Sequence, residues 1–345
     1  MSIKKVFHGL IILVLAIKPF SAVSQDALIY ITAGNKKEDG GDYDGALKEY
    51  NRAIEVDPNN AMAYYDRGIV KKEQGDPAGA LADYTKAINL APEFGEAYCN
   101  RANLERDNGN KSDALIDYNK AVEVEPDLPN AYFGRGCLES SQGNVDGAIS
   151  DYDKAIQLNP LDPQAYFNRG LAKYKKGNQD GALADYSKAI AINPRMDLAY
   201  SGRGNLKRSR GDLEGALGDF DKAIELNPNM GDYYFNRGNV YIDKGNFSNA
   251  INDFTRAIDF NPQDAESYSC RGKAKQKMND ATGAQADFKR ATELGLNNGN
   301  FKSDAASANQ PPQNEKPGWM WLTWIILPIS TIAIIARLMK RKPRK

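Results

Sequence analysis

The sequence contains almost no histidine. Its single histidine, His8, lies in an N-terminal stretch typical of an export signal, so the exported chain is expected to contain none. Histidine is the only side chain that titrates near neutral pH without perturbation, and it is the commonest metal ligand. A serine or cysteine nucleophile activated by histidine therefore cannot be built here, and we expect no metal site and no cofactor.

A glycine-rich phosphate-binding loop is also missing. Carboxylates are abundant, but they recur at fixed positions of the repeat described below, as expected in a scaffold. We therefore predict that the protein is not an enzyme. The alternative is an enzyme with paired carboxylates, acting for example on envelope polymers, and substitution of those carboxylates would test it.

Cysteine is scarce, with three residues in the chain, which is an odd number for an exported protein. One interpretation is a disulfide between Cys99 and Cys137, or a reactive thiol at one of the three positions. The interpretation we favour is that Cys99, Cys137 and Cys270 are small, half-buried hydrophobic residues. The sequence cannot give the distance that a disulfide requires.

An excess of basic residues is missing from the body of the chain. The formal net charge is zero, but residues 1–24 hold three basic groups and residues 318–345 hold six, with no acidic group in either segment. The remainder has 36 basic against 45 acidic residues, a net charge of about −9. Nucleic-acid binding needs clustered Lys and Arg, so we expect no nucleic-acid partner.

The two ends of the chain have the pattern of membrane signals. Residues 1–24 combine a basic start, an apolar run of twelve residues and small residues before Gln25, which predicts a cleaved signal peptide. Residues 318–336 form a charge-free apolar run with three tryptophans, long enough for a transmembrane helix. An uncleaved N-terminal anchor and a C-terminal sorting tail that is later removed are the alternatives.

The basic residues around the second run predict the topology. Residues 337–345 are strongly basic, so the positive-inside rule predicts a cytoplasmic tail there. Residues 299–317 are rich in Asn, Ser, Ala and Pro and are expected to be a flexible linker. The region between the two signals is then exported, in the periplasm or on the surface of a bacterial cell, and is attached to the membrane by a single helix.

The middle of the chain is an internal repeat. The segments "AYYDRG", "AYCNRA", "AYFGRG", "AYFNRG", "AYSGRG", "YYFNRG" and "SYSCRG" follow one another at intervals of 34 residues, and a weaker "IYITAG" precedes them. The pattern gives eight repeats without insertion between residues 27 and 298. Their bounds are 27–60, 61–94, 95–128, 129–162, 163–196, 197–230, 231–264 and 265–298.

Within each repeat, numbered 1 to 34, small and aromatic residues stand at fixed positions. Position 4 is aromatic, positions 8, 20 and 27 are small, position 24 is Tyr or Phe, and position 32 is Pro in seven repeats. This pattern resembles the tetratricopeptide repeat family over nearly four fifths of the chain. The resemblance implies an all-α fold, an α-solenoid in which helix-turn-helix repeats form a right-handed superhelix.

The last repeat differs from the others on one helical face. Positions 21 and 28 are apolar in the first seven repeats, but they are Gln285 and Thr292 in the eighth. Residues seven apart share a face of a helix. We infer that this face packs on the next repeat, and that the last repeat is polar there because no repeat follows it.

Arginine and aspartate recur together along the repeats. Repeats 2 to 8 have Arg at position 7 and Asp at position 23, whereas the first repeat has neither. This co-occurrence predicts a structural ion pair between the two helices of each repeat, with Arg169 and Asp185 as the example in repeat 5. A basic row for an acidic ligand is the alternative.

The predicted binding face lies on the first helix of each repeat. On a helical wheel, positions 2, 5, 6, 9, 12 and 13 point away from the buried positions 4, 8 and 11, and the family resemblance implies that they line the concave groove. Asparagines at positions 6 and 9 could hydrogen-bond the backbone of an extended peptide, similar to the asparagine ladders of superhelical members of the family. Aromatic rings at position 5 would add apolar contact. The candidate residues are Asn35, Asn100, Asn103, Asn168, Asn205, Asn236 and Asn239, with Tyr65, Phe133, Phe167 and Phe235.

The sequence therefore predicts a non-enzymatic scaffold, anchored in the membrane, that binds a protein or peptide partner in its groove. Asparagines that merely tolerate an exposed helix turn are the simpler interpretation of the same pattern. A secreted or surface-attached scaffold is the alternative if the C-terminal run is removed. Lateral self-association is a further possibility, which sedimentation would test.

Overall fold

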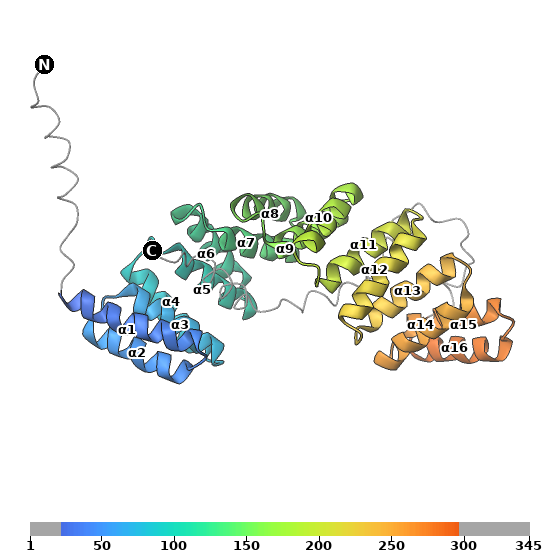
Figure 1. Ribbon diagram of the computed structural model, residues 1–345, viewed down its shortest axis with the longest axis horizontal. Helices are drawn as coiled ribbons and strands as arrows, with labels where there is room; N and C mark the ends of the chain where they lie inside the picture. Colours follow the sequence, from blue (N-terminus) through green and yellow to red (C-terminus); the bar gives the residue numbers. More distant parts are fainter. Residues whose placement is uncertain (1–21, 297–345) are drawn as a thin grey trace, which may run out of the picture. The chain divides into compact units, whose positions relative to one another are not determined.

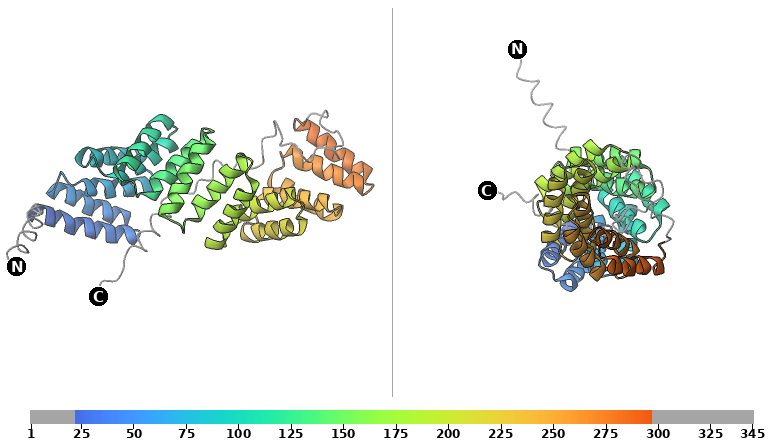
Figure 2. Two further views of the ribbon diagram at one scale, coloured as in Figure 1. Left: turned by 90° about the horizontal axis from the view of Figure 1, so that it is seen from above. Right: turned by 90° about the vertical axis from the view of Figure 1, so that its right-hand side faces the viewer.

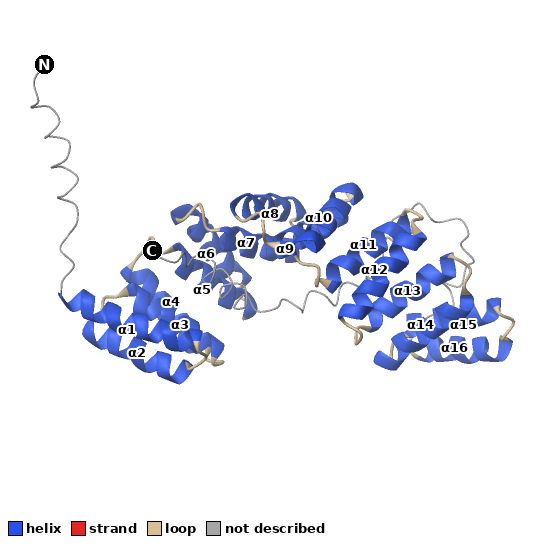
Figure 3. Cartoon of the chain, viewed as in Figure 1, coloured by secondary structure: helices blue, strands red, loops and turns tan. Residues whose placement is uncertain are grey.

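The computed structural model describes residues 22–296, and all regular secondary structure in that range is helical (Figure 3). Sixteen helices follow one another in this range, two in each 34-residue repeat. The helices are α1 (Ala22–Asp39), α2 (Tyr43–Val56), α3 (Ala61–Glu73), α4 (Pro77–Leu90), α5 (Gly95–Asp107), α6 (Lys111–Val124), α7 (Pro129–Ser141), α8 (Val145–Leu158), α9 (Pro163–Lys175), α10 (Gln179–Ile192), α11 (Asp197–Ser209), α12 (Leu213–Leu226), α13 (Gly231–Asp243), α14 (Phe247–Phe260), α15 (Ala265–Lys277) and α16 (Ala281–Glu293).

The chain divides into two compact units, Met1–Leu138 and Glu139–Lys345. In the first unit the pairs α1/α2, α3/α4 and α5/α6 are joined by contacts of α2 with α3 and of α4 with α5. The second unit repeats this arrangement from α8 to α16 (Figures 1 and 2). Within each unit, therefore, every helix packs mainly on its neighbours in the sequence, as expected of a repeat array.

In seven of the eight repeats, the turn between the two helices contains a glycine followed by an Asn or Asp at the start of the second helix. In repeat 5, Gly177 has φ +84°, a left-handed conformation that ends α9. Oδ1 of Asn178 then accepts a hydrogen bond of 2.9 Å from the Gly181 N–H at the start of α10. In the last repeat Asn279 takes the glycine's place with φ +66°, and asparagine is among the few other residues that tolerate this conformation.

The core of each pair forms where an aromatic ring packs on a residue without a bulky side chain. A Cβ added to Gly170 of α9 would lie 2.8 Å from Cε1 of Tyr186 on α10, so only a glycine lets the ring come this close. Ala182 and Ala189 on α10 are fully buried beside that ring. The small residues at positions 8, 20 and 27 thus allow the two helices to approach, and the ring at position 24 fills the space between them.

Consecutive repeats are held together by the apolar face inferred from the sequence. Leu81 and Ile88 of α4 belong to one hydrophobic cluster with Ala97 and Leu104 of the following helix α5. In the last repeat the equivalent residues of α16 are polar and exposed to solvent. The second helix of the last repeat therefore ends the described stack with a face that water can solvate.

The predicted signal peptide, linker, transmembrane helix and cytoplasmic tail lie outside the described residues, apart from the last three residues of the signal peptide, where α1 begins. Among the helices of the described range, none combines the length and the apolar character needed to cross a membrane.

Candidate functional site

The arginine of each repeat motif points between helices. In repeat 5, Arg169 donates from Nε and Nη2 to the two carboxylate oxygens of Asp185, at 2.9 and 2.6 Å, and from Nη1 to Asp153 at 2.7 Å. Only 15% of the Arg169 side chain and 5% of the Asp185 side chain are exposed. One guanidinium thus joins both helices of its own repeat to the second helix of the preceding repeat.

The same arrangement recurs along both units. Bidentate Arg–Asp pairs form in six repeats, and the Nη1 group of all seven arginines donates to position 25 of the preceding repeat. The six pairs are Arg67–Asp83, Arg101–Asp117, Arg169–Asp185, Arg203–Asp219, Arg237–Asp253 and Arg271–Asp287. The Nη1 acceptors are Asn51, Thr85, Asn119, Asp153, Ser187, Asp221 and Thr255. In the remaining repeat, Arg135 belongs to the first unit and Asp151 to the second.

These contacts determine the direction in which the pKa of Arg169 is shifted. Burial by itself lowers the pKa of Arg169, but the hydrogen bonds to Asp185 and Asp153 outweigh it and raise the pKa above its ordinary value. The guanidinium carbon also lies 5.4 Å from the ring centroid of Tyr166. The main donors of Arg169 are therefore already engaged, which disfavours the alternative of a basic row for an acidic ligand.

The position-5 rings lie deeper than the helical wheel suggests. Tyr65 and Phe167 are each only 6% exposed, and their ring centroids lie 5.9 and 5.8 Å from those of Tyr84 and Tyr186. The wheel misplaces them because it treats the first helix alone, whereas the position-24 ring of the second helix packs on the glycine at position 8 and also contacts the position-5 ring. Phe133 and Phe235 are half-buried. The structure thus moves Tyr65 and Phe167 from the predicted binding surface into the core.

The candidate asparagines of the first unit are all hydrogen-bonded to tyrosines. The Tyr50 hydroxyl lies 2.7 Å from Oδ1 of Asn35 and 2.7 Å from Oε2 of Glu38, which share its single proton as acceptors, and Oδ1 of Asn103 accepts from the Tyr118 hydroxyl at 2.6 Å. Nδ2 of Asn100 donates to the hydroxyl of Tyr65 in the preceding repeat at 2.9 Å. Asn103 is 3% exposed. These three amides therefore stabilise the repeats that contain them.

The candidate asparagines of the second unit differ. Asn205 is exposed, and Asn168, Asn236 and Asn239 are half-buried. No side-chain hydrogen bond to another described residue is formed by any of these four amides. They lie on α9, α11 and α13, so consecutive first helices of the second unit each present an amide whose donors and acceptor remain available.

In repeats 4 and 6, position 6 is a glycine where repeats 3, 5 and 7 have an asparagine, and the structure gives a steric reason for this. A Cβ at Gly134 would lie 2.5 Å from Cε1 and 2.7 Å from the hydroxyl oxygen of Tyr118 in the preceding repeat. A Cβ at Gly202 would lie 3.1 Å from the ring of Tyr186. A larger residue at Gly134 would force Tyr118 to shift, whereas Gly202 has more room. The sequence shows the alternation of Asn and Gly, but it gave no sign of this contact.

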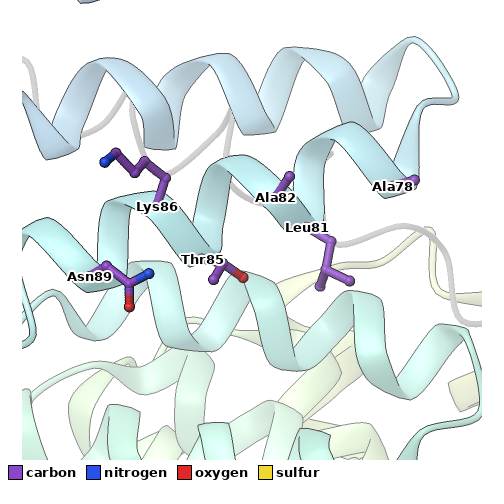
Figure 4. Close-up of a pocket in the computed structure, with 6 residues that line it drawn as sticks. All are labelled: Ala78, Leu81, Ala82, Thr85, Lys86 and Asn89. Atoms are coloured by element: carbon purple, nitrogen blue, oxygen red, sulfur yellow. The ribbon is translucent and has the colours of Figure 1, made fainter. Parts of the chain in front are cut away.

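Two hollows on the described surface lie away from the asparagines. One of about 460 Å³ is lined by Ala78, Leu81, Ala82, Thr85, Lys86 and Asn89, all from α4 (Figure 4). A second, of about 440 Å³, is lined by residues of α13 and α14, including Arg237 and Asp253. Neither contains a position-6 or position-9 asparagine. Among residues 22–296, no group of three or more His, Cys, Asp or Glu side chains could hold a metal ion.

The cysteines behave as hydrophobic residues. Cys99, Cys137 and Cys270 form no disulfide with one another, so the proposed Cys99–Cys137 bridge is absent from the structure. Cys99 is 3% exposed and packs in the core of repeat 3. Burial raises the pKa of the Cys99 and Cys270 thiols to about 12. Both thiols are therefore protonated at neutral pH and are poor nucleophiles.

Known protein families match most of the repeat region. A family model described as TPR repeat matches residues 34–75, 139–177, 204–242 and 238–279. Two models described as tetratricopeptide repeat match residues 163–196 and 65–129. No curated protein matches the chain.

Solved structures of repeat proteins are similar to the chain. One is a tetratricopeptide repeat protein from Parabacteroides merdae ATCC 43184, which is 23% identical over 78% of this chain and 99% of that chain, with a TM-score of 0.51. PilF from Pseudomonas aeruginosa is 17% identical over 58% of this chain and 91% of its own, with a TM-score of 0.53. YrrB, described as having an unusual peptide-binding site, is 27% identical over 53% of this chain and 95% of its own, with a TM-score of 0.48. The likeness to the first two structures, at identities below 25%, shows the fold alone.

Proposed function

Since the chain is a tetratricopeptide repeat protein, we propose that it is a non-enzymatic scaffold that binds the backbone of an extended partner polypeptide through repeats 5 to 7. Four amides would carry this binding: Asn168, Asn205, Asn236 and Asn239. Each amide offers a donor and an acceptor, which is what an extended backbone presents along its length. Recognition of this kind depends little on the partner's side chains.

The observation that supports this proposal most directly is the difference in hydrogen bonding between the asparagines. In the first unit the amide oxygens of Asn35 and Asn103 accept from tyrosine hydroxyls, and the amide NH₂ of Asn100 donates to one. These groups are already engaged inside the unit and are less available to a ligand. Asn168, Asn205, Asn236 and Asn239 make no such bond within residues 22–296. The half-buried ring of Phe235, 5.7 Å from that of Phe254, would contribute apolar contact beside Asn236.

Binding is tested by selecting short peptides on the full-length protein and measuring affinity for one selected peptide. Changing Asn168, Asn205, Asn236 and Asn239 together to Ala should weaken binding at least tenfold, because several charge-neutral hydrogen bonds of about 1 kcal/mol each are lost. The matched control changes Asn35, Asn100 and Asn103 to Ala and should leave affinity unchanged. N-methylation of the peptide backbone should weaken binding as much as the quadruple change. Unaltered affinity in both tests would refute the proposal.

We further propose that the repeats are exported and remain attached to a membrane. The apolar runs at residues 1–24 and 318–336 and the basic segment at residues 337–345 support this location. In this arrangement the repeats face the periplasm or the cell surface, and the linker 299–317 separates them from the bilayer. The competing proposal, a secreted or surface-attached scaffold, requires removal of the C-terminal run. The mass of the mature protein distinguishes them, because only the anchored form retains residues 318–345.

A further inference from the structure

The aromatic residue at position 24 differs between the repeats that contain a position-9 asparagine. In the first unit, Asn35 and Asn103 stand opposite Tyr50 and Tyr118. In the second unit, Asn205 and Asn239 stand opposite Phe220 and Phe254, at the same separation of 15 residues. The amide is therefore the same in all four repeats, and the hydroxyl that binds it is present in only two of them.

The position-24 ring packs on a glycine at position 8 in three of these repeats, whereas position 8 of repeat 3 is Ala102. Cβ atoms added to Gly34, Gly204 and Gly238 at position 8 would lie 2.5, 3.1 and 2.8 Å from the rings of Tyr50, Phe220 and Phe254, respectively. All four position-24 rings are fully buried. The ring atoms nearest the glycine are Cε1, Cδ1 and Cζ for both Tyr50 and Phe254, so a hydroxyl on Phe254 would enter the space that the hydroxyl of Tyr50 occupies, next to the position-9 amide. Phe220 presents Cζ to Gly204, so a hydroxyl on that carbon would lie against α11, the helix that carries Asn205.

Burial makes the tyrosine–asparagine bond hard to replace. The Tyr118 hydroxyl accepts from Nη1 of Arg106 at 3.2 Å and donates to Asn103 at 2.6 Å, so both of its hydrogen-bonding roles are satisfied inside the repeat. A ligand that took Asn103 would leave this buried hydroxyl without its acceptor, which is unfavourable. Burial also raises the pKa of Tyr118, so the hydroxyl keeps the proton that it donates.

We propose that the position-24 residue determines which position-9 asparagines bind the partner backbone: a tyrosine there holds the position-9 amide inside the repeat, and a phenylalanine leaves it to the ligand. This inference rests on the proposed function, which it refines by assigning specificity to Phe220 and Phe254. These residues act through Asn205 and Asn239 and do not themselves touch the partner.

The test adds the missing hydroxyls to the full-length protein. Phe220→Tyr and Phe254→Tyr together should weaken binding of the selected peptide about as much as Asn205→Ala and Asn239→Ala together, although every asparagine is retained. In the double Tyr variant, the side-chain NH₂ protons of Asn205 and Asn239 should exchange more slowly with solvent, as measured by NMR. Phe220→Leu and Phe254→Leu serve as the control for altered packing without a hydroxyl, with thermal unfolding recorded for each variant.

The outcomes separate this inference from the proposed function. If Asn168→Ala and Asn236→Ala weaken binding but the two Phe→Tyr changes leave both affinity and exchange unaltered, the inference is wrong and the proposed function stands. If the Leu variants lose as much affinity as the Tyr variants, the loss is a packing effect and the inference is also wrong. If none of the asparagine substitutions changes the affinity, the proposed function and the inference fail together.

Discussion

The two compact units carry asparagines at the same repeat positions and use them differently. In the first unit the amides of Asn35, Asn100 and Asn103 accept from or donate to tyrosine hydroxyls. In the second unit the equivalent amides face Phe220, Phe254 or no hydroxyl at all, and they form no side-chain bond to a described residue. The role of a repeated residue is thus decided by the residue opposite it, and not by its own position in the repeat.

The arginines at position 7 provide the contrasting case, because they form the same ion pairs with the position-23 aspartates in both units. Asp83 of the first unit binds Arg67 and Lys71, and Asp185 of the second binds Arg169 and Lys173, with nearly identical distances. If these pairs are structural, the loss of either aspartate should destabilise its own unit, and peptide binding should be affected only through stability.

The largest predicted effect is therefore that of Asp83→Ala or Asp185→Ala, each of which should cost about 3–5 kcal/mol of local stability, since a half-buried guanidinium loses its carboxylate. Asp83→Ala should be the more damaging change. Arg169 keeps the carboxylate of Asp153, whereas Arg67 keeps only the amide of Asn51. Hydrogen exchange of the backbone amides in α4 and α10, measured in both variants, gives the local free energy of unfolding of each helix. Equal protection of both helices in the variants and the parent would contradict the structural role of the pairs.

A smaller effect is expected from the asparagines, and here the two units should differ. Asn103→Ala removes the acceptor of the buried Tyr118 hydroxyl and should cost about 1–3 kcal/mol. Asn239→Ala removes no bond between described residues and should stay within about 0.5 kcal/mol of the parent. Denaturant unfolding of the two variants measures the difference. Asn103→Asp, which retains an acceptor oxygen, is the control that should recover part of the lost stability.

The repeat period, the helix pairs and the Arg–Asp pairing could be predicted from the sequence because each depends on residues that recur at fixed separations. Gly177 and Asn178 mark the turn of their repeat, and the recurrence of Arg169 with Asp185 points to their contact. The third contact of the arginine, to Asp153 of the preceding repeat, could not be predicted because position 25 varies among Asn, Thr, Asp and Ser in the first seven repeats.

A helical wheel could not predict which asparagines are buried and hydrogen-bonded, because a wheel treats one helix alone. Asn103 and Asn205 have the same angle on their helices, yet one is buried and the other is exposed. They also differ in hydrogen bonding, because Tyr118 on the partner helix has a hydroxyl that donates to Asn103, whereas Phe220 opposite Asn205 has none. The sequence does contain this signal, since Tyr or Phe stands 15 residues after each position-9 asparagine. This pattern can be interpreted only once the contact between positions 9 and 24 is known.

The smallest predicted effect concerns the thiols, for which the two units should behave alike. Burial raises the pKa of Cys99 in the first unit and of Cys270 in the second to about 12. At pH 8 only about one thiol in ten thousand of each is then ionised, so both should react slowly with a thiol-specific reagent such as a disulfide dye. Raising the pH toward 10 should increase the rate roughly tenfold per pH unit, because the pKa values lie above this range.

The number of thiols that react after denaturation tests the absence of the bridge between Cys99 and Cys137 in the same experiment. Three reactive thiols per chain in denaturant are expected, against one if that bridge forms. Slow reaction in the folded protein with three thiols on unfolding would show that Cys99 and Cys270 serve the core of their own units. A fast reaction of Cys99 but not of Cys270 would instead show that the first unit opens more readily than the second, since a thiol reacts only when its repeat exposes it.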